Sequence, residues 1–227
     1  MAMKAIFLIL TVFCSFSFVT AQREKSIFEY GETEVITKSE YMTPFYFDYQ
    51  GVSSYLFKSF TISSEDNKYS YIVKLSNYEG TENDGGFYRI IDIEYENKNI
   101  LNLKQSDGWD KLKERIRPYA SNDYFLAIPL TRTSTALIFI GHPYNSQPEL
   151  LTIVVLNKDK ATLVFNKEIM VNKIEYDKAS SSFVMNLQDY PIEYLDETTP
   201  ANAAKLFKIF LESDVLKFGG PYGIVME

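Results

Sequence analysis

Apolar and polar residues alternate along most of the chain, and this period of two is the pattern of half-buried β-strands. The alternation is clear over residues 69–75 and again over residues 87–95. Between them, Asn83-Asp84-Gly85-Gly86 contains an Asp-Gly pair, which supplies the positive φ that tight turns need. The two segments are therefore predicted to form a hairpin.

A second hairpin is predicted from the β-branched run 150–156, the turn Asn157-Lys158-Asp159-Lys160 and the returning segment 161–166. Two further alternating segments follow, at residues 169–176 and 183–187. Together these four segments predict an antiparallel meander. Upstream, residues 124–130 and 136–140 also have strand character. Residues 136–140 are apolar on both faces, which predicts a strand at the centre of a sheet.

Two helices are expected to interrupt the strands. Trp109, Leu112 and Ile116 recur at helical spacing and predict a helix over residues 107–117, which Pro118 would end. For the second, Thr199 is a suitable N-cap and Pro200 suits the first helical position.

The second helix, over residues 199–217, would present one apolar stripe to the rest of the domain and stop before Gly219-Gly220. The stripe consists of Ala203, Leu206, Phe207, Phe210 and Leu211. The predicted fold class is therefore α+β, mostly antiparallel β-sheet with two short-to-medium helices, in a single compact domain. A break into two subdomains near residues 117–123 is the alternative, and no internal repeat is visible at a fixed period.

Residues 1–21 have the pattern of a secretory signal peptide. Lys4 provides the positive charge, residues 5–19 form an uncharged apolar run, and Ala21 ends a small-residue cleavage site. The run is shorter than the ~20 residues that span a bilayer. A lipid anchor at Cys14 is a weaker alternative, because Phe13 stands where a small residue is needed. The expectation is a secreted or periplasmic domain, residues 22–227, with no membrane span after removal of the leader.

Composition excludes several classes of function. The 227 residues carry 23 Lys plus Arg against 30 Asp plus Glu, a formal net charge of −7, which disfavours a nucleic-acid partner. One His and one Cys do not make a usual zinc site, so no metal and no cofactor are predicted. Cleavage after Ala21 would remove Cys14 as well. A chain without disulfides or Asn-x-Ser/Thr sequons fits a bacterial exported protein.

No catalytic motif with a phosphate loop, a nucleophile elbow or a zinc-binding helix is present, and no catalytic residue is assigned. The candidate binding residues are His142, Tyr144 and Asn145, in a loop after the predicted central strand, together with Trp109. The loop could bind a ligand or be an ordinary polar turn. Trp109 could be an exposed stacking platform for sugar or peptide, or a buried helix residue.

Two further clusters have ordinary explanations beside functional ones. Asp92, Glu94 and Glu96 alternate on one strand and could bind a cation, but they could also face solvent. Tyrosines between residues 40 and 57 could form a recognition surface or part of a sheet.

The absence of catalytic motifs favours a non-catalytic binding or interaction module of the bacterial cell envelope, with a protein or glycan ligand. The alternative is a carboxylate-based hydrolase of polysaccharide or peptide. Nothing in the sequence identifies the partner or the oligomeric state.

Overall fold

The structure is a computed structural model and describes residues 49–80, 86–114, 116–141, 148–177, 179–189, 204–219 and 224–225. Its strands are β1 (Ser54–Ser63), β2 (Ser70–Tyr78), β3 (Tyr88–Tyr95), β4 (Lys98–Trp109), β5 (Leu126–Thr131), β6 (Ser134–Gly141), β7 (Leu150–Asn157), β8 (Lys160–Glu168), β9 (Met170–Asp177), β10 (Ser182–Asp189), β11 (Ala204–Glu212), β12 (Val215–Gly219) and β13 (Ile224–Val225). One 3₁₀ turn, η1 (Arg117–Tyr119), lies between β4 and β5.

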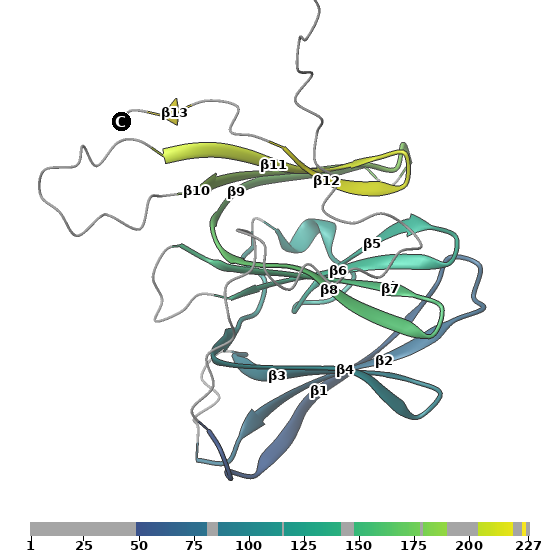
Figure 1. Ribbon diagram of the computed structural model, residues 1–227, viewed down its shortest axis with the longest axis vertical. Coiled ribbons are helices and arrows are strands. Elements are labelled where there is room, and N and C mark those ends of the chain that lie inside the picture. Colours follow the sequence, from purple (N-terminus) through teal and green to yellow (C-terminus); the bar gives the residue numbers. More distant parts are fainter. Residues whose placement is uncertain are drawn as a thin grey trace, which may run out of the picture.

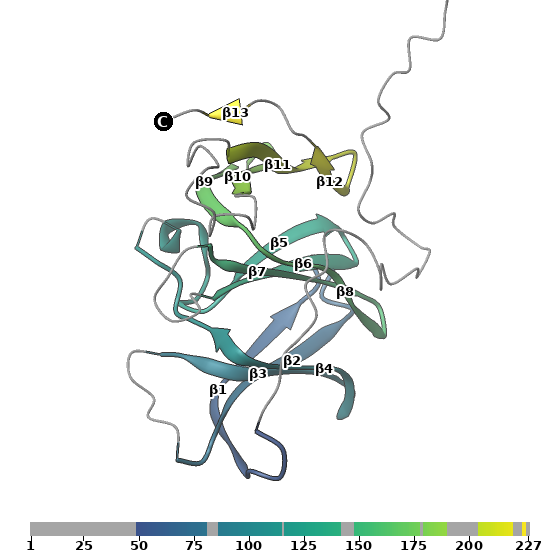
Figure 2. The same ribbon diagram turned by 60° about the vertical axis from the view of Figure 1, so that its left-hand side comes forward.

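The strands form three antiparallel sheets, and each sheet is a meander in which chain neighbours pair (Figure 1). The orders are β1-β2-β3-β4, β5-β6-β7-β8 and β9-β10-β11-β12, and β13 also pairs with β11. Figures 1 and 2 show the sheets stacked as three layers, with β5–β8 in the middle. The described chain is thus one four-strand unit used three times in succession, with no matching repeat in its sequence.

The middle sheet is apolar on both faces because each face covers a separate core. In β6, Ala136, Ile138 and Ile140 pack with the C-terminal sheet, whereas Leu137 and Phe139 pack with the N-terminal sheet. Every residue of β6 is buried. The prediction that residues 136–140 form a central strand is confirmed, and the strand is central both within its sheet and between the layers.

One chain of polar groups crosses the core between the first two sheets. The indole Nε1–H of Trp109 donates to Thr152 Oγ1 at 2.9 Å, and the Thr152 hydroxyl donates to Asn166 Oδ1 at 2.6 Å. All three residues are completely buried. Each donor therefore keeps a partner away from water, which limits the free-energy cost of burying it.

β4 comes into close contact with the middle sheet at a pair of glycines. A Cβ atom on Gly141 would lie 2.3 Å from the carbonyl oxygen of Gly108, and one on Gly108 would lie 2.4 Å from that of Tyr88. Just beyond this point, the Asp110 N–H donates to the Ile140 carbonyl at 3.1 Å. A side chain at Gly141 would push the first two layers apart at this edge, whereas one at Gly108 would push β4 away from Tyr88 of its own sheet.

The helix predicted over residues 107–117 is wrong. Residues up to Trp109 continue β4, and the residues before η1 form an irregular connection. The apolar spacing has another cause, since Trp109 belongs to the first core whereas Leu112 and Ile116 belong to the second. The segment passes around the edge of the middle sheet and contributes side chains to both of its faces.

The helix predicted over residues 199–217 is also wrong, because β11 and β12 occupy residues 204–212 and 215–219. Phe207, Ile209 and Leu211 face the core at a period of two. Phe210 pairs with Val184 of β10 and is not part of that core. Apolar side chains on both faces of β11 produced a spacing that also fits a helix. Thr199, Pro200 and Ala203 lie outside the described residues.

The fold class is therefore all-β and not α+β, although the β-rich part of the expectation is confirmed. Both predicted hairpins are present, as β2–β3 and β7–β8. The predicted meander is divided, because β8 ends the middle sheet and β9 begins the C-terminal one. The chain changes layers at Ile169, whose N–H donates to the Glu149 carbonyl at 2.8 Å.

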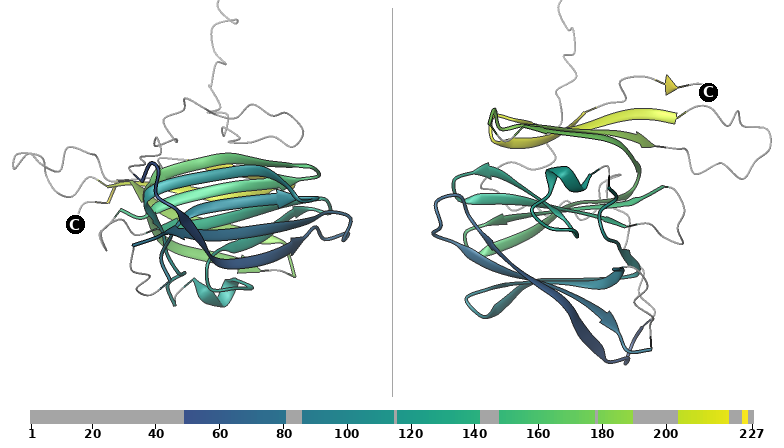
Figure 3. Two further views of the ribbon diagram at one scale, coloured as in Figure 1. Left: turned by 90° about the horizontal axis from the view of Figure 1, so that it is seen from below. Right: turned by 180° about the vertical axis from the view of Figure 1, so that it is seen from behind.

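The three meanders run in the same sense, so the ends of their strands lie at two ends of the stack (Figure 3). The connections β1–β2, β5–β6, β9–β10 and β11–β12 share one end, here called the turn end. Several are made by non-glycine residues at positive φ, such as Ser213 (51°) and Asp214 (65°). The β5–β6 and β11–β12 turns have two residues, whereas residues 64–69 join β1 to β2. β2, β6 and β10 end at the other end of their sheets.

Two adjacent residues of β11 distinguish this arrangement from a helix. We expect Ile209→Ala to lower the free energy of unfolding by roughly 2–5 kcal/mol, because Ile209 is completely buried in the core. Phe210→Ala should cost less, although it removes more atoms, because Phe210 lies on the outer face. Urea unfolding of both variants measures this, and a larger loss for Phe210 would contradict the assignment of faces.

Candidate functional site: a pocket at the turn end

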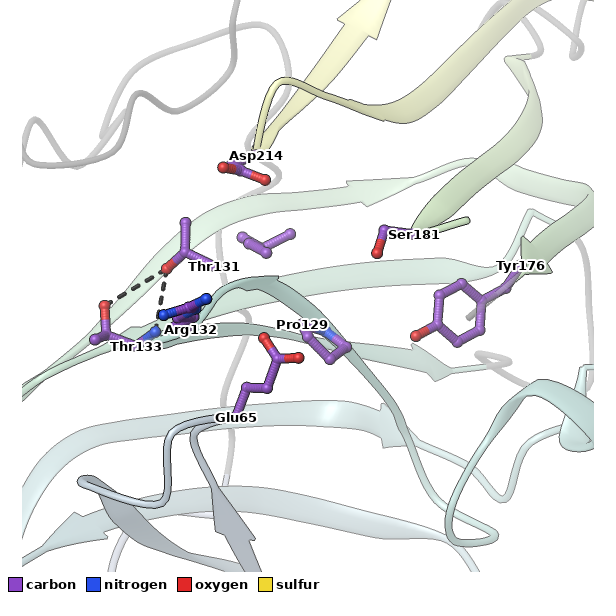
Figure 4. A pocket seen from close by; sticks show the side chains of 9 residues that line it. Glu65, Pro129, Thr131, Arg132, Thr133, Tyr176, Ser181 and Asp214 are labelled. Atoms are coloured by element: carbon purple, nitrogen blue, oxygen red, sulfur yellow. Dashed lines mark hydrogen bonds between the residues drawn. The ribbon is translucent and has the colours of Figure 1, made fainter. Parts of the chain in front are cut away.

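Turns from all three sheets line one pocket of about 540 Å³ (Figure 4). The β1–β2 turn contributes Glu65, and the β11–β12 turn contributes Asp214. The other lining residues come from the β5–β6 and β9–β10 hairpins: Pro129, Leu130, Thr131, Arg132, Thr133, Tyr176 and Ser181. The volume lies within the ~300–1,000 Å³ range of small-molecule sites.

Hydrogen bonds of Ser64 and Asp66 shape the β1–β2 turn and join its backbone to that of the β5–β6 turn. The Ser64 hydroxyl donates to Asp66 Oδ1 at 2.7 Å and accepts from the Tyr69 N–H at 3.1 Å. The Asp66 N–H in turn donates to the Arg132 carbonyl at 3.1 Å, which joins the first sheet to the second. The Ser64 hydrogen bond is the main cause that lowers the pKa of Asp66.

The β5–β6 turn is shaped by an edge strand and by hydroxyl groups. β5 is at the edge of its sheet, where Pro129 is tolerated, and its pairing with β6 shifts between Pro129 and Thr131. Thr131 Oγ1 lies 2.5 Å from the Ser134 hydroxyl and accepts from the Thr133 N–H at 3.3 Å. These bonds fix the backbone that presents Arg132.

The C-terminal sheet supplies the opposite wall. Tyr176, at the end of β9, is half-buried, and its ring meets Phe183 edge-on at 6.3 Å. Burial and the carboxylates of Asp177 and Glu65 raise the pKa of the Tyr176 hydroxyl, which therefore stays a proton donor. Ser181, at φ 53°, and Asp214 stand at the tips of the next two turns.

The polar side chains of the pocket do not neutralise one another. Within the described part of the chain, the side chains of Glu65, Arg132, Tyr176, Ser181 and Asp214 make no hydrogen bond or ion pair. Figure 4 shows the Glu65, Arg132 and Asp214 side chains at the pocket from different turns. The pocket thus has donors and acceptors available to a ligand, beside an apolar wall of Pro129 and Leu130.

The pocket is not a metal centre of an ordinary kind. No group of three or more His, Cys, Asp or Glu residues able to hold a metal ion occurs among the described residues. Two carboxylates beside a guanidinium form a site for hydrogen bonding.

Of the binding residues predicted from the sequence, His142, Tyr144 and Asn145 lie outside the described residues. Gly141, which precedes them in the sequence, ends β6 at the end of the sheet opposite the β5–β6 turn. Trp109 is described and is completely buried, and its indole lies 6.0 Å from the Tyr88 ring and bonds to Thr152. No face of the indole is exposed to a ligand, and the structure does not bring Trp109 to the pocket.

The three acidic residues Asp92, Glu94 and Glu96 do not come together as one cluster. Asp92 accepts hydrogen bonds from Asn99 (2.8 Å) and Asn102 (2.5 Å), and Glu94 pairs with Lys74 at 2.6 Å. Glu96 lies at φ 49° in the β3–β4 turn, away from that face. Asp92 and Glu94 therefore belong to an internally paired polar sheet face.

The tyrosines between residues 40 and 57 do not form one surface in the described part of the chain, which includes Tyr49 and Tyr55. Tyr49 stacks on Tyr78 at 4.9 Å, and Arg89 lies over the Tyr49 ring at 5.3 Å. Tyr55 is half-buried in β1. Tyr41 and Tyr46 lie outside the described residues.

Sequence reasoning missed the pocket because its residues are far apart in the chain and stand in turns. The β1–β2 and β5–β6 turns carry no glycine to mark them, and the β11–β12 turn fell within a predicted helix. A signal was available at Ser213-Asp214, two polar residues between apolar alternating runs, which is the length of a tight hairpin turn.

Comparisons with known proteins give no relative for this chain: no family model, no curated protein and no solved structure matches it. In the portion of the chain with a described structure, no helix has the length and apolar character needed to cross a membrane.

The Asp66 network predicts a specific loss of stability in acid. The pKa of Asp66 is lowered from its ordinary 3.8 in the folded state, so the unfolded state binds more protons between the two values. The stabilisation is fully present above the ordinary pKa and is lost as the pH falls through the lower, folded value. We expect Asp66→Asn to reduce the decline in the free energy of unfolding below about pH 4.

Ser64→Ala provides a matched variant for this prediction, because it removes the largest cause of the shift and keeps the carboxylate. It should flatten the same part of the pH profile. Chemical denaturation between about pH 2.5 and pH 6 measures both effects. A profile as steep as that of the unmodified protein in both variants would contradict the role of this hydrogen bond.

Proposed function

We propose that this protein is an exported, non-catalytic binding module that holds a small polar ligand in the turn-end pocket. The observation that carries the proposal is the set of five polar side chains that converge from three sheets without bonding to one another. Few convergent polar groups beside an apolar wall are the usual features of a small-molecule site. A protein that only needed stable turns would gain by pairing Arg132 with Glu65 or Asp214.

The pocket supports binding better than catalysis. A general acid in a carboxylate hydrolase is kept protonated by apolar surroundings. Glu65 and Asp214 are both exposed at the tips of turns, where water surrounds them. Their positions favour hydrogen bonding to a ligand over proton transfer.

Export is the second part of the proposal and rests on the leader sequence. We expect cleavage after Ala21, so that the exported chain begins at Gln22 and carries no lipid. Intact-mass spectrometry of material from the periplasm or the medium measures this directly. An uncleaved leader in that fraction, or lipid on Cys14, would falsify the assignment.

The binding site is tested with substitutions in the pocket. Ligand-observed NMR on the full exported chain would use a mixture of neutral saccharides, amino acids, short peptides and organic acids. At least one class should bind, and Arg132→Ala should weaken it about tenfold or more, the effect of losing a charged hydrogen-bond partner. Arg117→Ala is the matched control, because Arg117 is exposed on η1 and does not line the pocket.

A carboxylate-based hydrolase is the second candidate, because two carboxylates line one pocket. It predicts that a polysaccharide or peptide is cleaved and that Glu65→Gln and Asp214→Asn each lower the rate about 10²- to 10⁴-fold. Binding without turnover in the unmodified protein would leave the non-catalytic module as the function.

A further inference from the structure

We infer that the ligand of the turn-end pocket is a neutral carbohydrate, a short oligosaccharide bound through its hydroxyl groups. This inference rests on the proposed binding function and adds to it the chemical class of the ligand. It follows from three properties of the pocket: the kinds of hydrogen-bonding group present, the balance of their charges, and the apolar surface between them.

The hydrogen-bonding groups are of opposite kinds and lie around one small space. The carboxylate groups of Glu65 and Asp214 are hydrogen-bond acceptors, whereas the guanidinium of Arg132 can only donate. Tyr176 and Ser181 carry hydroxyl groups, which do both. A ligand that satisfies all of them must offer donors and acceptors along its whole edge. A sugar hydroxyl is a donor and an acceptor at once, so neighbouring hydroxyls of one ring can meet a carboxylate and a guanidinium together.

The charges of the pocket disfavour a charged ligand. A ligand carboxylate on Arg132 would enter a space that Glu65 and Asp214 also line, in a chain whose formal net charge is −7. A ligand ammonium on either carboxylate would enter the space that Arg132 lines. Like charges in one site raise the free energy of binding. A neutral ligand with many hydroxyls avoids both conflicts and still receives charge-assisted hydrogen bonds, which are the stronger kind.

The apolar surface fits the faces of sugar rings. Pro129 and the Tyr176 ring are half-buried, Leu130 is 4% exposed, and all three line the pocket. Pyranose rings carry hydroxyls at their edge and C–H groups on their faces, so a face can pack on these side chains while the edge reaches Arg132, Glu65 and Asp214. In Figure 4 the Tyr176 side chain extends towards Pro129, and both residues line the pocket together with the polar groups.

The test is calorimetric titration of the full exported chain with named probes. The neutral probes are maltotriose, cellotriose, xylotriose and tri-N-acetylchitotriose. The charged comparators are trigalacturonate, triglycine and the cationic trisaccharide of glucosamine. We expect a neutral trisaccharide to bind and to lose about 10- to 100-fold in affinity in Arg132→Ala and in Asp214→Asn. Arg117→Ala should bind as the unmodified protein does.

Salt provides an independent readout. Binding of a neutral saccharide should change less than about twofold between about 50 and 500 mM NaCl, because no charge on the ligand is screened. Binding of a charged comparator through Arg132 or the carboxylates should weaken markedly over the same range. Salt-sensitive binding of the neutral trisaccharide would count against the inference.

The outcomes separate this inference from the proposed function. If only a charged comparator binds, and Arg132→Ala weakens it, the pocket is a binding site and the carbohydrate assignment is overturned. If a neutral trisaccharide binds equally well to Arg132→Ala and Asp214→Asn, it binds elsewhere and the assignment to this pocket is overturned. If no probe binds at millimolar concentration, the inference is overturned and the binding function loses its support as well.

Discussion

The middle sheet has to be apolar on both faces, and the rest of the architecture depends on this requirement. A four-stranded sheet with two apolar faces needs a cover on each side. The N-terminal and C-terminal meanders provide the two covers, so neither cover is independent of the sheet between them. Burying both faces removes enough apolar surface from water to stabilise a domain whose described residues contain no α-helix and no disulfide.

A three-layer stack requires the chain to cross from one sheet to the next twice. Each crossing depends on residues that ordinary apolar side chains could not replace. Gly141 allows the backbone of β6 to touch that of β4 at Gly108. At the change from β8 to β9, the completely buried Glu149 carboxylate accepts from the Val171 N–H at 2.6 Å and pairs with Lys113 at 3.0 Å. A buried carboxylate without these partners would be strongly destabilising, so the crossing is held by a pairing that apolar packing cannot supply.

The sequence predicted the strands far better than the helices, and the reason is the layered core. Alternation identifies a strand with one buried face, as in β2 and β3. It identifies a doubly buried strand when the run is short and β-branched, as in β6 and β7. It fails at β11, where Phe207 faces the core and Phe210 does not, and at residues 109–116, where the apolar side chains serve two cores. The pocket could not be predicted from the sequence, because its residues come together only when the three sheets are stacked.

Because the pocket is lined by all three sheets, ligand binding would also stabilise the stack of sheets. A ligand in the pocket would touch Glu65 of the first sheet, Arg132 of the second and Tyr176 or Asp214 of the third. Separation of any two layers would break part of the site, so a ligand that binds only the stacked form stabilises the stack as a whole. A ligand in the pocket would therefore add contacts between the three sheets at their shared turn end.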